Sequence, residues 1–187
     1  MKFIKMEQKQ KGKFITRYDI TYETEDKKEK RYEMISRDGD MQTFEALHAR
    51  KADAVVLIMH NEEKDKILLN REFRLAVGEW VYNFPAGLID PGETAYEAAK
   101  RELWEETGLS LDSMVDILPE SYSAVGFSNE KNVCLVGTAS GTFQKSTSSV
   151  EEIVPGWYSK EEVKELLKTQ PFAARTQAYC YLWSRMV

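Results

Sequence analysis

Acidic residues are concentrated near the middle of the chain, between Asp90 and Glu106. On a helix that turns roughly 100° per residue, Glu102, Glu105 and Glu106 occupy about a third of the circumference. Glu102 and Glu106 are one turn apart, and such like-charged pairs destabilise a helix unless a cation lies between them. The charge also falls in the second half of the helix, where the helix dipole disfavours it. A solvated acidic face is the alternative interpretation.

The chemistry that this cluster indicates is cation binding. Clustered carboxylate oxygens suit Mg²⁺ or Mn²⁺, which prefer hard oxygen ligands, better than Zn²⁺. When phosphate oxygens complete the shell of such an ion, the arrangement is one that phosphoryl-transfer enzymes use. The glutamates therefore predict a Mg²⁺ site, with Mn²⁺ as an alternative ion, that acts on a phosphate-containing small molecule.

These glutamates need a helix with defined ends and a sheet that holds it. The turn residues Asp90-Pro91-Gly92 precede a helix expected over residues 93–107, and Gly108 favours a left-handed helix end. Ser159 to Glu162 has capping-box spacing before a second helix, and Pro171 is expected to open a third. Short apolar runs predict strands over residues 54–59, 66–69, 81–84, 133–136 and 153–157, and a mobile Gly/Ser/Thr-rich loop is expected over residues 137–149.

The spacing of residues 87–109 resembles a known signature. Gly87, five residues, Glu93, seven residues and then Arg101-Glu102-Leu103-Trp104-Glu105-Glu106-Thr107-Gly108-Leu109 match every fixed position of the Nudix box. This motif is far more specific than a lone glycine motif. The resemblance implies an α/β fold: a Nudix-type α/β/α sandwich with a mixed sheet and an N-terminal β-hairpin extension, in which the box forms loop, helix and loop.

The resemblance also implies roles for individual residues. Glu102 and Glu106 would be the principal metal ligands, and Glu105 a ligand or water activator. The carbonyl of Ala86, just before the box, would be a further ligand. The remaining positions of the motif would be structural, with the Arg101 fork pairing a glutamate such as Glu93; they are Gly87, Glu93, Arg101 and Gly108.

A wider stretch resembles the ADP-ribose pyrophosphatase branch of that family. The segments Arg71-Glu72-Phe73-Arg74 and Phe84–Glu93 carry this likeness. It implies hydrolysis of ADP-ribose to AMP and ribose 5-phosphate, with Arg71 and Arg74 contacting the diphosphate or the ribose. Ordinary surface arginines at a strand end are the alternative. One departure is Val125, where that branch typically has proline, and it bears on the substrate more than on hydrolysis.

Three glutamates outside the box are further candidates. By resemblance, Glu130 would add a metal or water contact, although an exposed loop carboxylate is the alternative. A glutamate in the loop before the last strand acts as general base in the resembling branch, and Glu151 or Glu152 would fill that role here. Another nucleotide sugar, a dinucleotide or a nucleoside triphosphate is an alternative substrate, and a non-catalytic nucleotide-sensing module is a third interpretation, which the intact box disfavours.

The N-terminal part is expected to be a separate element. Residues 13–24 and 31–36 predict a β-hairpin, which is marginal in water by itself and needs a partner surface. We therefore expect an N-terminal β extension over residues 1–48 and the Nudix domain over residues 49–187. In the resembling branch this extension builds a homodimer with shared active sites.

Composition narrows the function classes. The net charge of −5 argues against a nucleic-acid or anionic-membrane binder. The sequence shows no apolar run long enough for a signal peptide or for a span of about 20 residues. Cys134 and Cys180 form no CxxC pair and are expected to be buried small hydrophobes. A cytoplasmic protein is the expectation.

Overall fold

The computed structural model describes residues 1–48, 51–147 and 151–186, and these form two compact units. The first unit comprises Met1–Asp53 and Glu120–Asn132, and the second comprises Ala54–Pro119 and Val133–Val187. None of the helices in the described ranges is both long enough and apolar enough to span a bilayer.

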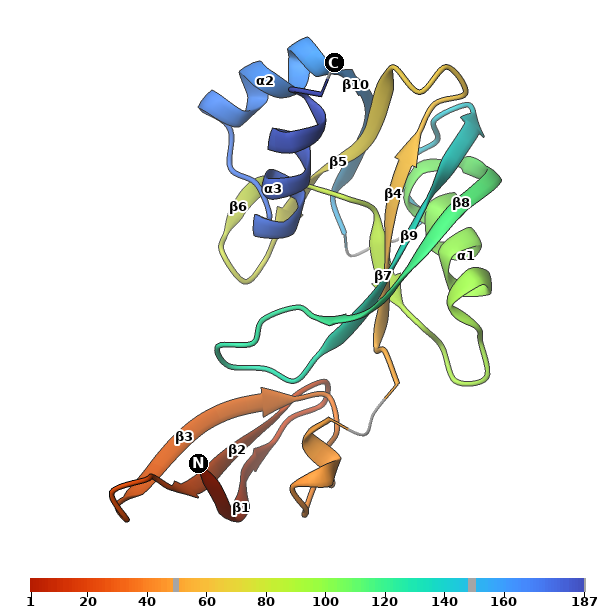
Figure 1. The fold of residues 1–187 in the computed structure, drawn as a ribbon. Helices are drawn as coiled ribbons and strands as arrows, with labels where there is room; N and C mark the ends of the chain where they lie inside the picture. The colour runs from red at the N-terminus through yellow and green to blue at the C-terminus, as the bar shows by residue number, and fades with distance from the viewer. Residues whose placement is uncertain (49–50, 148–150, 187) are drawn as a thin grey trace. The chain divides into compact units, whose positions relative to one another are not determined.

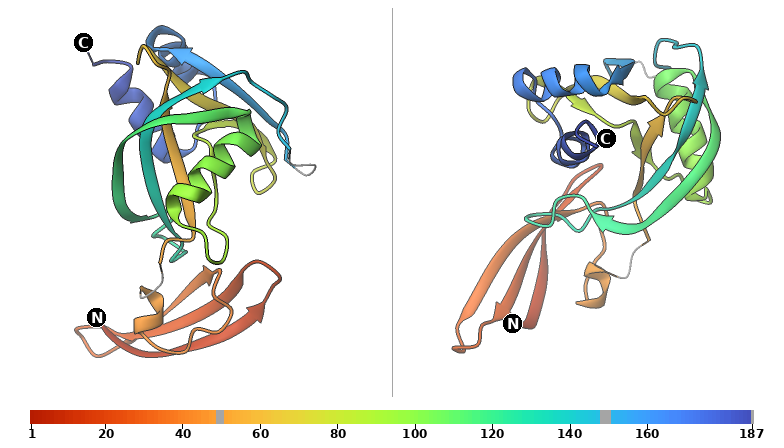
Figure 2. Two further views of the ribbon diagram at one scale, coloured as in Figure 1. Left: turned by 90° about the vertical axis from the view of Figure 1, so that its right-hand side faces the viewer. Right: turned by 45° about the horizontal axis from the view of Figure 1, so that its top comes forward.

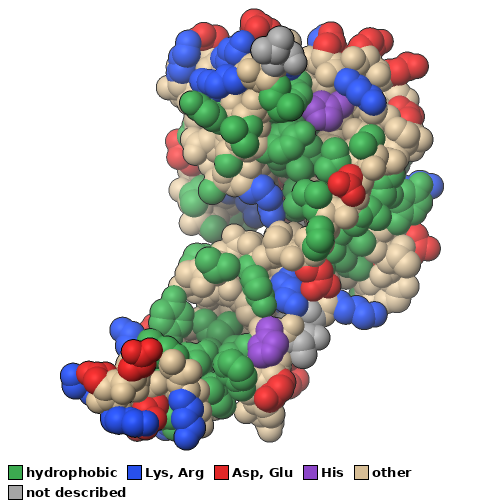
Figure 3. Space-filling view, viewed as in Figure 1, with side chains coloured by type: hydrophobic (Ala, Val, Ile, Leu, Met, Phe, Trp, Pro, Cys, Tyr) green, Lys and Arg blue, Asp and Glu red, His purple; other side chains and the backbone are tan. Residues whose placement is uncertain are grey.

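The first unit is built on an antiparallel sheet of strand order β1-β2-β3. The predicted hairpin is confirmed as β2 (Thr16–Glu23) paired with β3 (Glu29–Ser36). The strand β1 (Lys2–Lys11) was not predicted, because its charged residues hide the partly buried Phe3 and Met6. Figure 3 shows hydrophobic side chains beside the charged tip of this unit. Its exposed large apolar residues include Ile4, Phe14, Ile15, Tyr32 and Phe44.

The second unit contains a sheet of seven described strands and three described helices. The strand order is β10-β5-β4-β9-β8, with β6 beside β5 and β7 beside β4. The arrows of β4 and β9 point the same way in Figure 1, so the sheet is mixed. The strands are β4 (Ala54–His60), β5 (Lys66–Arg74), β6 (Glu79–Asn83), β7 (Ala86–Leu88), β8 (Leu109–Tyr122), β9 (Lys131–Gly141) and β10 (Ile153–Ser159), and the helices are α1 (Ala95–Thr107), α2 (Lys160–Thr169) and α3 (Ala174–Trp183).

Helices cover both faces of this sheet (Figures 1 and 2). On one face, Ala98, Ala99 and Leu103 of α1 pack against apolar side chains of β4, β5 and β9. On the other face, Val163 of α2 and Cys180 of α3 pack against the opposite side of the same strands. The predicted α/β/α sandwich with a mixed sheet is therefore confirmed. Cys134 and Cys180 are both buried and free, as expected.

Two predictions about element ends were wrong. Residues 137–141, expected in a mobile loop, continue strand β9, and residues 148–149 of that predicted loop lie outside the described part of the chain. The last helix begins at Ala174 instead of Pro171. The Pro171 carbonyl accepts a hydrogen bond from the Tyr82 amide, so this segment continues along β6 before the helix starts.

Candidate active site

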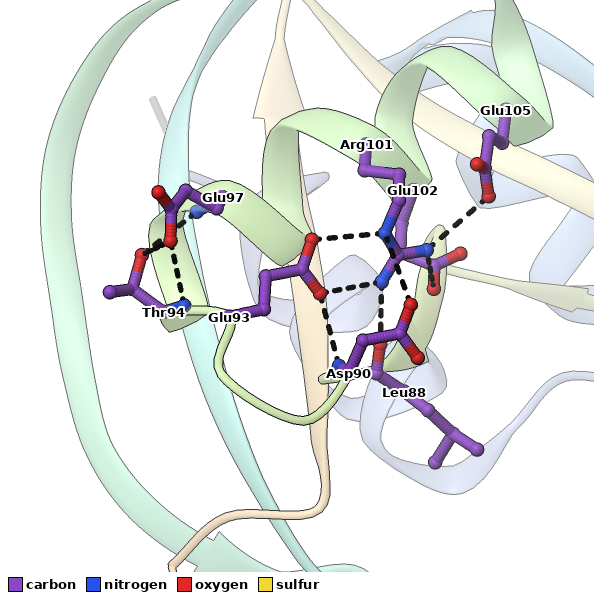
Figure 4. Close-up of polar contacts among 8 residues, drawn as sticks. All are labelled: Leu88, Asp90, Glu93, Thr94, Glu97, Arg101, Glu102 and Glu105. Carbon is purple, nitrogen blue, oxygen red and sulfur yellow. Dashed lines mark hydrogen bonds and ion pairs between the residues drawn. The ribbon is translucent and has the colours of Figure 1, made fainter.

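The glutamate helix α1 has closed ends. At its start, Thr94 and Glu97 form a reciprocal capping box that satisfies two free amides (Figure 4). At its end, Gly108 adopts a left-handed backbone with φ of 78°, and its amide donates to the Trp104 carbonyl. Both ends of the helix are therefore fixed by contacts that do not involve Glu102, Glu105 or Glu106.

Arg101 is the centre of an ion-pair network on α1 (Figure 4). Its Nε and Nη2 atoms donate to the two oxygens of Glu93 at 3.0 and 2.8 Å, and Nη2 also donates to the Leu88 carbonyl at 2.8 Å. Nη1 donates to Glu102 at 2.7 Å and to Glu105 at 3.3 Å. The pairing of Arg101 with Glu93 expected from the motif is thus present, and hydrogen bonding from Arg101 lowers the pKa of the Glu93 carboxyl.

Replacing Arg101 with lysine should therefore lower the free energy of unfolding by about 1–3 kcal/mol, because an ammonium group cannot reproduce the bidentate fork or reach the Leu88 carbonyl at the same time. Urea unfolding of the variant measures this change. Lys100→Arg, an exposed change on the same helix, is the matched control. A loss below about 0.5 kcal/mol, the range of ordinary surface changes, would contradict the structural role.

Glu106 is the buried carboxylate of the site, with 6% of its surface exposed. Its Oε2 atom accepts hydrogen bonds from Asn70 Nδ2 at 2.8 Å and from the Ala86 amide at 3.3 Å. Burial raises the pKa of the Glu106 carboxyl well above its usual value, and the negative charges of Glu72, Glu102 and Glu151 raise it further. Carboxylates from β5, from α1 and from the loop before β10 therefore lie close enough for the charges of Glu72, Glu102 and Glu151 to repel that of Glu106.

Glu102 lies directly against the backbone at Gly87. A Cβ atom at Gly87 would lie 1.9 Å from Glu102 Cδ, so only glycine leaves room for this carboxylate. Burial raises the pKa of the Glu102 carboxyl, and hydrogen bonding from Arg101 opposes that rise. Two neighbouring residues thus position the two glutamates. Gly87 leaves the space that the Glu102 carboxylate occupies, and the Ala86 amide donates a hydrogen bond to Glu106.

Strand β5 separates the two arginines that were predicted to bind substrate. Arg74 shares a strand face with Glu72, and its Nη1 lies 3.7 Å from Glu72 Oε1. Arg71 points to the other face, where its guanidinium lies 4.6 Å from the centre of the Trp80 ring. The structure therefore brings Arg74, and not Arg71, to the glutamate side of the sheet.

Glu72 is a buried acid beside the box glutamates that the sequence did not single out as a candidate. It has 6% of its surface exposed and lies two residues from Asn70, which bonds Glu106. Asn70, Glu72 and Arg74 alternate along β5 and therefore share a face, but this pattern can be recognised only once the strand is known to continue past Leu69 to Arg74. A cavity of about 270 Å³ opens here, lined by Glu72, Phe73, Arg74, Leu75, Ala76, Glu151, Glu152 and Ile153.

The two general-base candidates lie beside this cavity. The Glu152 carbonyl accepts a hydrogen bond from the Phe73 amide at 3.0 Å, which fixes the end of the loop against β5. The negative charge of Glu151 raises the pKa of the carboxyl groups of Glu72, Glu102 and Glu106. Upstream, the Thr147 amide donates to the Glu105 carbonyl at 2.9 Å, so the loop is also attached to the end of α1.

Glu130 belongs to the first unit. Its carboxylate accepts hydrogen bonds from Arg37 Nε at 2.6 Å and from Ser123 Oγ at 3.0 Å. Val125, which stands where the resembling branch has proline, is 78% exposed. The partners of Glu130 within its own unit are therefore an arginine and a serine.

The family model of the NUDIX domain matches residues 50–180, which is well over half of the chain. The chain belongs to the Nudix family. It is 32% identical over 95 residues to the ADP compounds hydrolase NudE of Escherichia coli, covering 51% of this chain and 50% of that protein. It is 42% identical over 81 residues to an ADP-ribose pyrophosphatase of Saccharomyces cerevisiae, covering 43% of this chain and 34% of that protein. The chain thus spans half or less of the length of these two curated relatives.

The fold of this Nudix chain also matches a solved structure. The crystal structure of an ADP compounds hydrolase superposes with a TM-score of 0.71, covering 99% of this chain and 93% of that chain at 20% sequence identity. At that identity the match shows the shared Nudix fold and leaves the substrate to be inferred from the site.

Nudix hydrolases generally use divalent metal ions, and the donor set fits such an ion. Its donors are carboxylate oxygens, and a cation would relieve the repulsion around buried Glu106. Asn70 is fully buried and its Oδ1 has no hydrogen-bond partner in the described part of the chain, which leaves an oxygen donor beside Glu106. Among the described residues, no three acidic, histidine or cysteine side chains already surround one point, and Arg101 is paired with Glu102 and Glu105. A cation bound here would compete with Arg101 for the oxygens of these two glutamates.

Proposed function

We propose that the chain is a Mg²⁺-dependent Nudix pyrophosphohydrolase that cleaves the diphosphate of a nucleoside diphosphate linked to a second group. The substrate that we favour is ADP-ribose, cleaved to AMP and ribose 5-phosphate. The observation that carries the proposal is the convergence of the box glutamates on Gly87 and Ala86, beside a cavity that contains Arg74. The names of the two relatives support an ADP-containing substrate.

In this mechanism the chain's own residues position the diphosphate and handle a proton. Arg74 binds phosphate oxygens at the cavity, and Glu102, Glu105 and Glu106, with the Ala86 carbonyl, would hold the cation. A bound Mg²⁺ would neutralise phosphate charge and make water more acidic. A glutamate accepts the proton of the attacking water, whose oxygen bonds to one phosphorus while the bridging P–O bond breaks. We propose Glu151 as this base in preference to Glu152, because Glu151 is close enough to Glu102 and Glu106 for its charge to raise the pKa of both.

A substrate panel tests the proposal. With Mg²⁺ present, ADP-ribose, other nucleoside diphosphate sugars, dinucleoside polyphosphates and nucleoside triphosphates are incubated with the enzyme, and products are identified by chromatography. We expect ADP-ribose to give AMP and ribose 5-phosphate with the highest kcat/KM. Release of pyrophosphate from a triphosphate, without cleavage of ADP-ribose, would overturn the substrate assignment and keep the hydrolase class. The intact box disfavours a binding module without turnover.

We also propose that the first unit joins two copies into a homodimer. The exposed apolar residues Phe14, Ile15, Tyr32 and Phe44 on so small a unit support this proposal, because removing apolar surface from water favours association. A monomer in light scattering at micromolar concentration would remove it.

A further inference from the structure

Glu72 lies on strand β5 of the sheet, whereas Glu102, Glu105 and Glu106 lie on helix α1. Asn83 Nδ2 donates to Glu72 Oε1 at 2.9 Å. The Asn83 side-chain oxygen in turn accepts from the Phe84 amide at 2.9 Å and from Thr176 Oγ1 at 2.8 Å, and Thr176 is fully buried. The Glu72 carboxylate is thus oriented by a fixed chain of hydrogen bonds between β6 and α3.

The charge of Glu72 is only partly compensated by these contacts. Asn83 and Arg74 both approach Oε1, and the Arg74 side chain, 3.7 Å away, is more than half exposed. A buried carboxylate with one amide hydrogen bond and one distant ion pair carries a desolvation penalty that these partners do not offset. Burial raises the pKa of the Glu72 carboxyl, the Asn83 hydrogen bond and the charge of Arg74 oppose that rise in part, and the charge of Glu151 adds to it. Such an arrangement favours an additional positive partner.

Asn70 gives an independent indication of a ligand at the same place. Its Nδ2 atom bonds Glu106, while its Oδ1 atom is buried without a hydrogen-bond partner in the described chain. Buried amide oxygens are nearly always satisfied, so this one indicates a partner of positive charge or a donor group. Asn70 and Glu72 share one face of β5, so the unsatisfied oxygen and the undercompensated carboxylate are neighbours along the strand.

We infer that Glu72 is a further member of the cation site, contributing its charge and an oxygen donor from the sheet. The inference rests on the metal dependence in the proposed function and extends it to a residue outside the box. Beside Glu72 a cation fits better than a further anion, because Glu151 and Glu152 line the same cavity as Glu72, and a cation there would also offset the charge of the phosphates that Arg74 is proposed to bind. Converging carboxylates in a low-dielectric recess concentrate cations.

Direct cation binding tests the inference without nucleotide. Wild type and Glu72→Gln are titrated with Mn²⁺, and free Mn²⁺ is measured by electron paramagnetic resonance. Glutamine keeps an oxygen for Asn83 and replaces the charge and the other carboxylate oxygen with a neutral NH2 group of similar size, so the fold should persist, which thermal unfolding checks. Glu79→Gln, an exposed change of the same charge at the start of β6, is the matched control. We expect Glu72→Gln to weaken Mn²⁺ affinity about tenfold and Glu79→Gln to change it less than about twofold.

A second variant separates charge from shape. Glu72→Asp keeps the charge and shortens the side chain, so it should retain more affinity than Glu72→Gln. Equal Mn²⁺ affinity in wild type and Glu72→Gln would overturn the inference, and so would wild-type protein that binds no Mn²⁺. Wild-type protein that binds Mn²⁺ but leaves ADP-ribose intact, with weakened binding in Glu72→Gln, would reject the proposed substrate and support the role of Glu72.

Discussion

Replacing Glu106 with glutamine should lower kcat at least about a thousandfold, which corresponds to roughly 4 kcal/mol of transition-state stabilisation. Glu106 is the most buried acid of α1, and its position is fixed by Asn70 and by the Ala86 amide. Glutamine can keep an oxygen at this position and accept the same two hydrogen bonds. The change therefore removes a cation ligand and its charge while preserving the local contacts.

The stability of the same variant gives a second readout. Burial and three neighbouring carboxylates disfavour the charged form of Glu106 in the folded protein. Without divalent cation at neutral pH, Glu106→Gln should therefore unfold at the same or a higher temperature than wild type. Steady-state kinetics on the preferred substrate and thermal unfolding in a chelator measure the two effects, with exposed Glu62→Gln as the control. A kcat within about tenfold of wild type, roughly 1.4 kcal/mol, would contradict the ligand assignment.

The elements that hold the site could be predicted where local signals were strong. Helix α1 follows from the Asp90–Gly92 turn and from Gly108, and the structure places its ends within two residues of the predicted helix. Helix α2 follows from the capping box at Ser159, which is present. These features depend on residues close together in sequence, so the sequence alone is sufficient to find them.

The sheet side of the site could not be assigned in the same way. The apolar run of β5 ends at Leu69, whereas the strand continues to Arg74 because β10 and β6 pair with its polar end. Without that extension, the alternation that puts Glu72 on the glutamate face and Arg71 on the other is not visible. The length of β5 depends on its pairing with β6 and with β10, which is distant in sequence. A strand end that is set by such pairing carries little local sequence signal.

Gly87 offers a way to displace a box glutamate without deleting it. Gly87→Ala should lower kcat/KM about a hundredfold, roughly 2.7 kcal/mol, because the new Cβ atom would occupy the place of the Glu102 carboxylate. The contacts would be 1.9 to 2.2 Å, far inside van der Waals distance. Gly87 is not among the glycines with positive φ, so alanine can adopt its backbone without strain.

The fold should tolerate this change, because the colliding atoms are the end of a flexible side chain that can rotate away. Unfolding free energy should therefore change by less than about 1 kcal/mol, as for a surface substitution. Gly126→Ala is the matched control, since a Cβ atom there meets nothing within 4 Å. A large loss of stability in Gly87→Ala, with activity lost in proportion, would assign Gly87 a purely structural role.

A double-mutant cycle decides whether Gly87 acts through Glu102. If the alanine methyl only displaces that carboxylate, then Gly87→Ala should add little to the defect of Glu102→Ala, because the group that it displaces is already absent. Additive losses would mean that the alanine disturbs another part of the site, such as the neighbouring Ala86 amide that bonds Glu106. Measuring kcat/KM and Mn²⁺ affinity for both single variants and the double variant distinguishes the two, since non-additivity should appear in both quantities when the shared element is the Glu102 ligand.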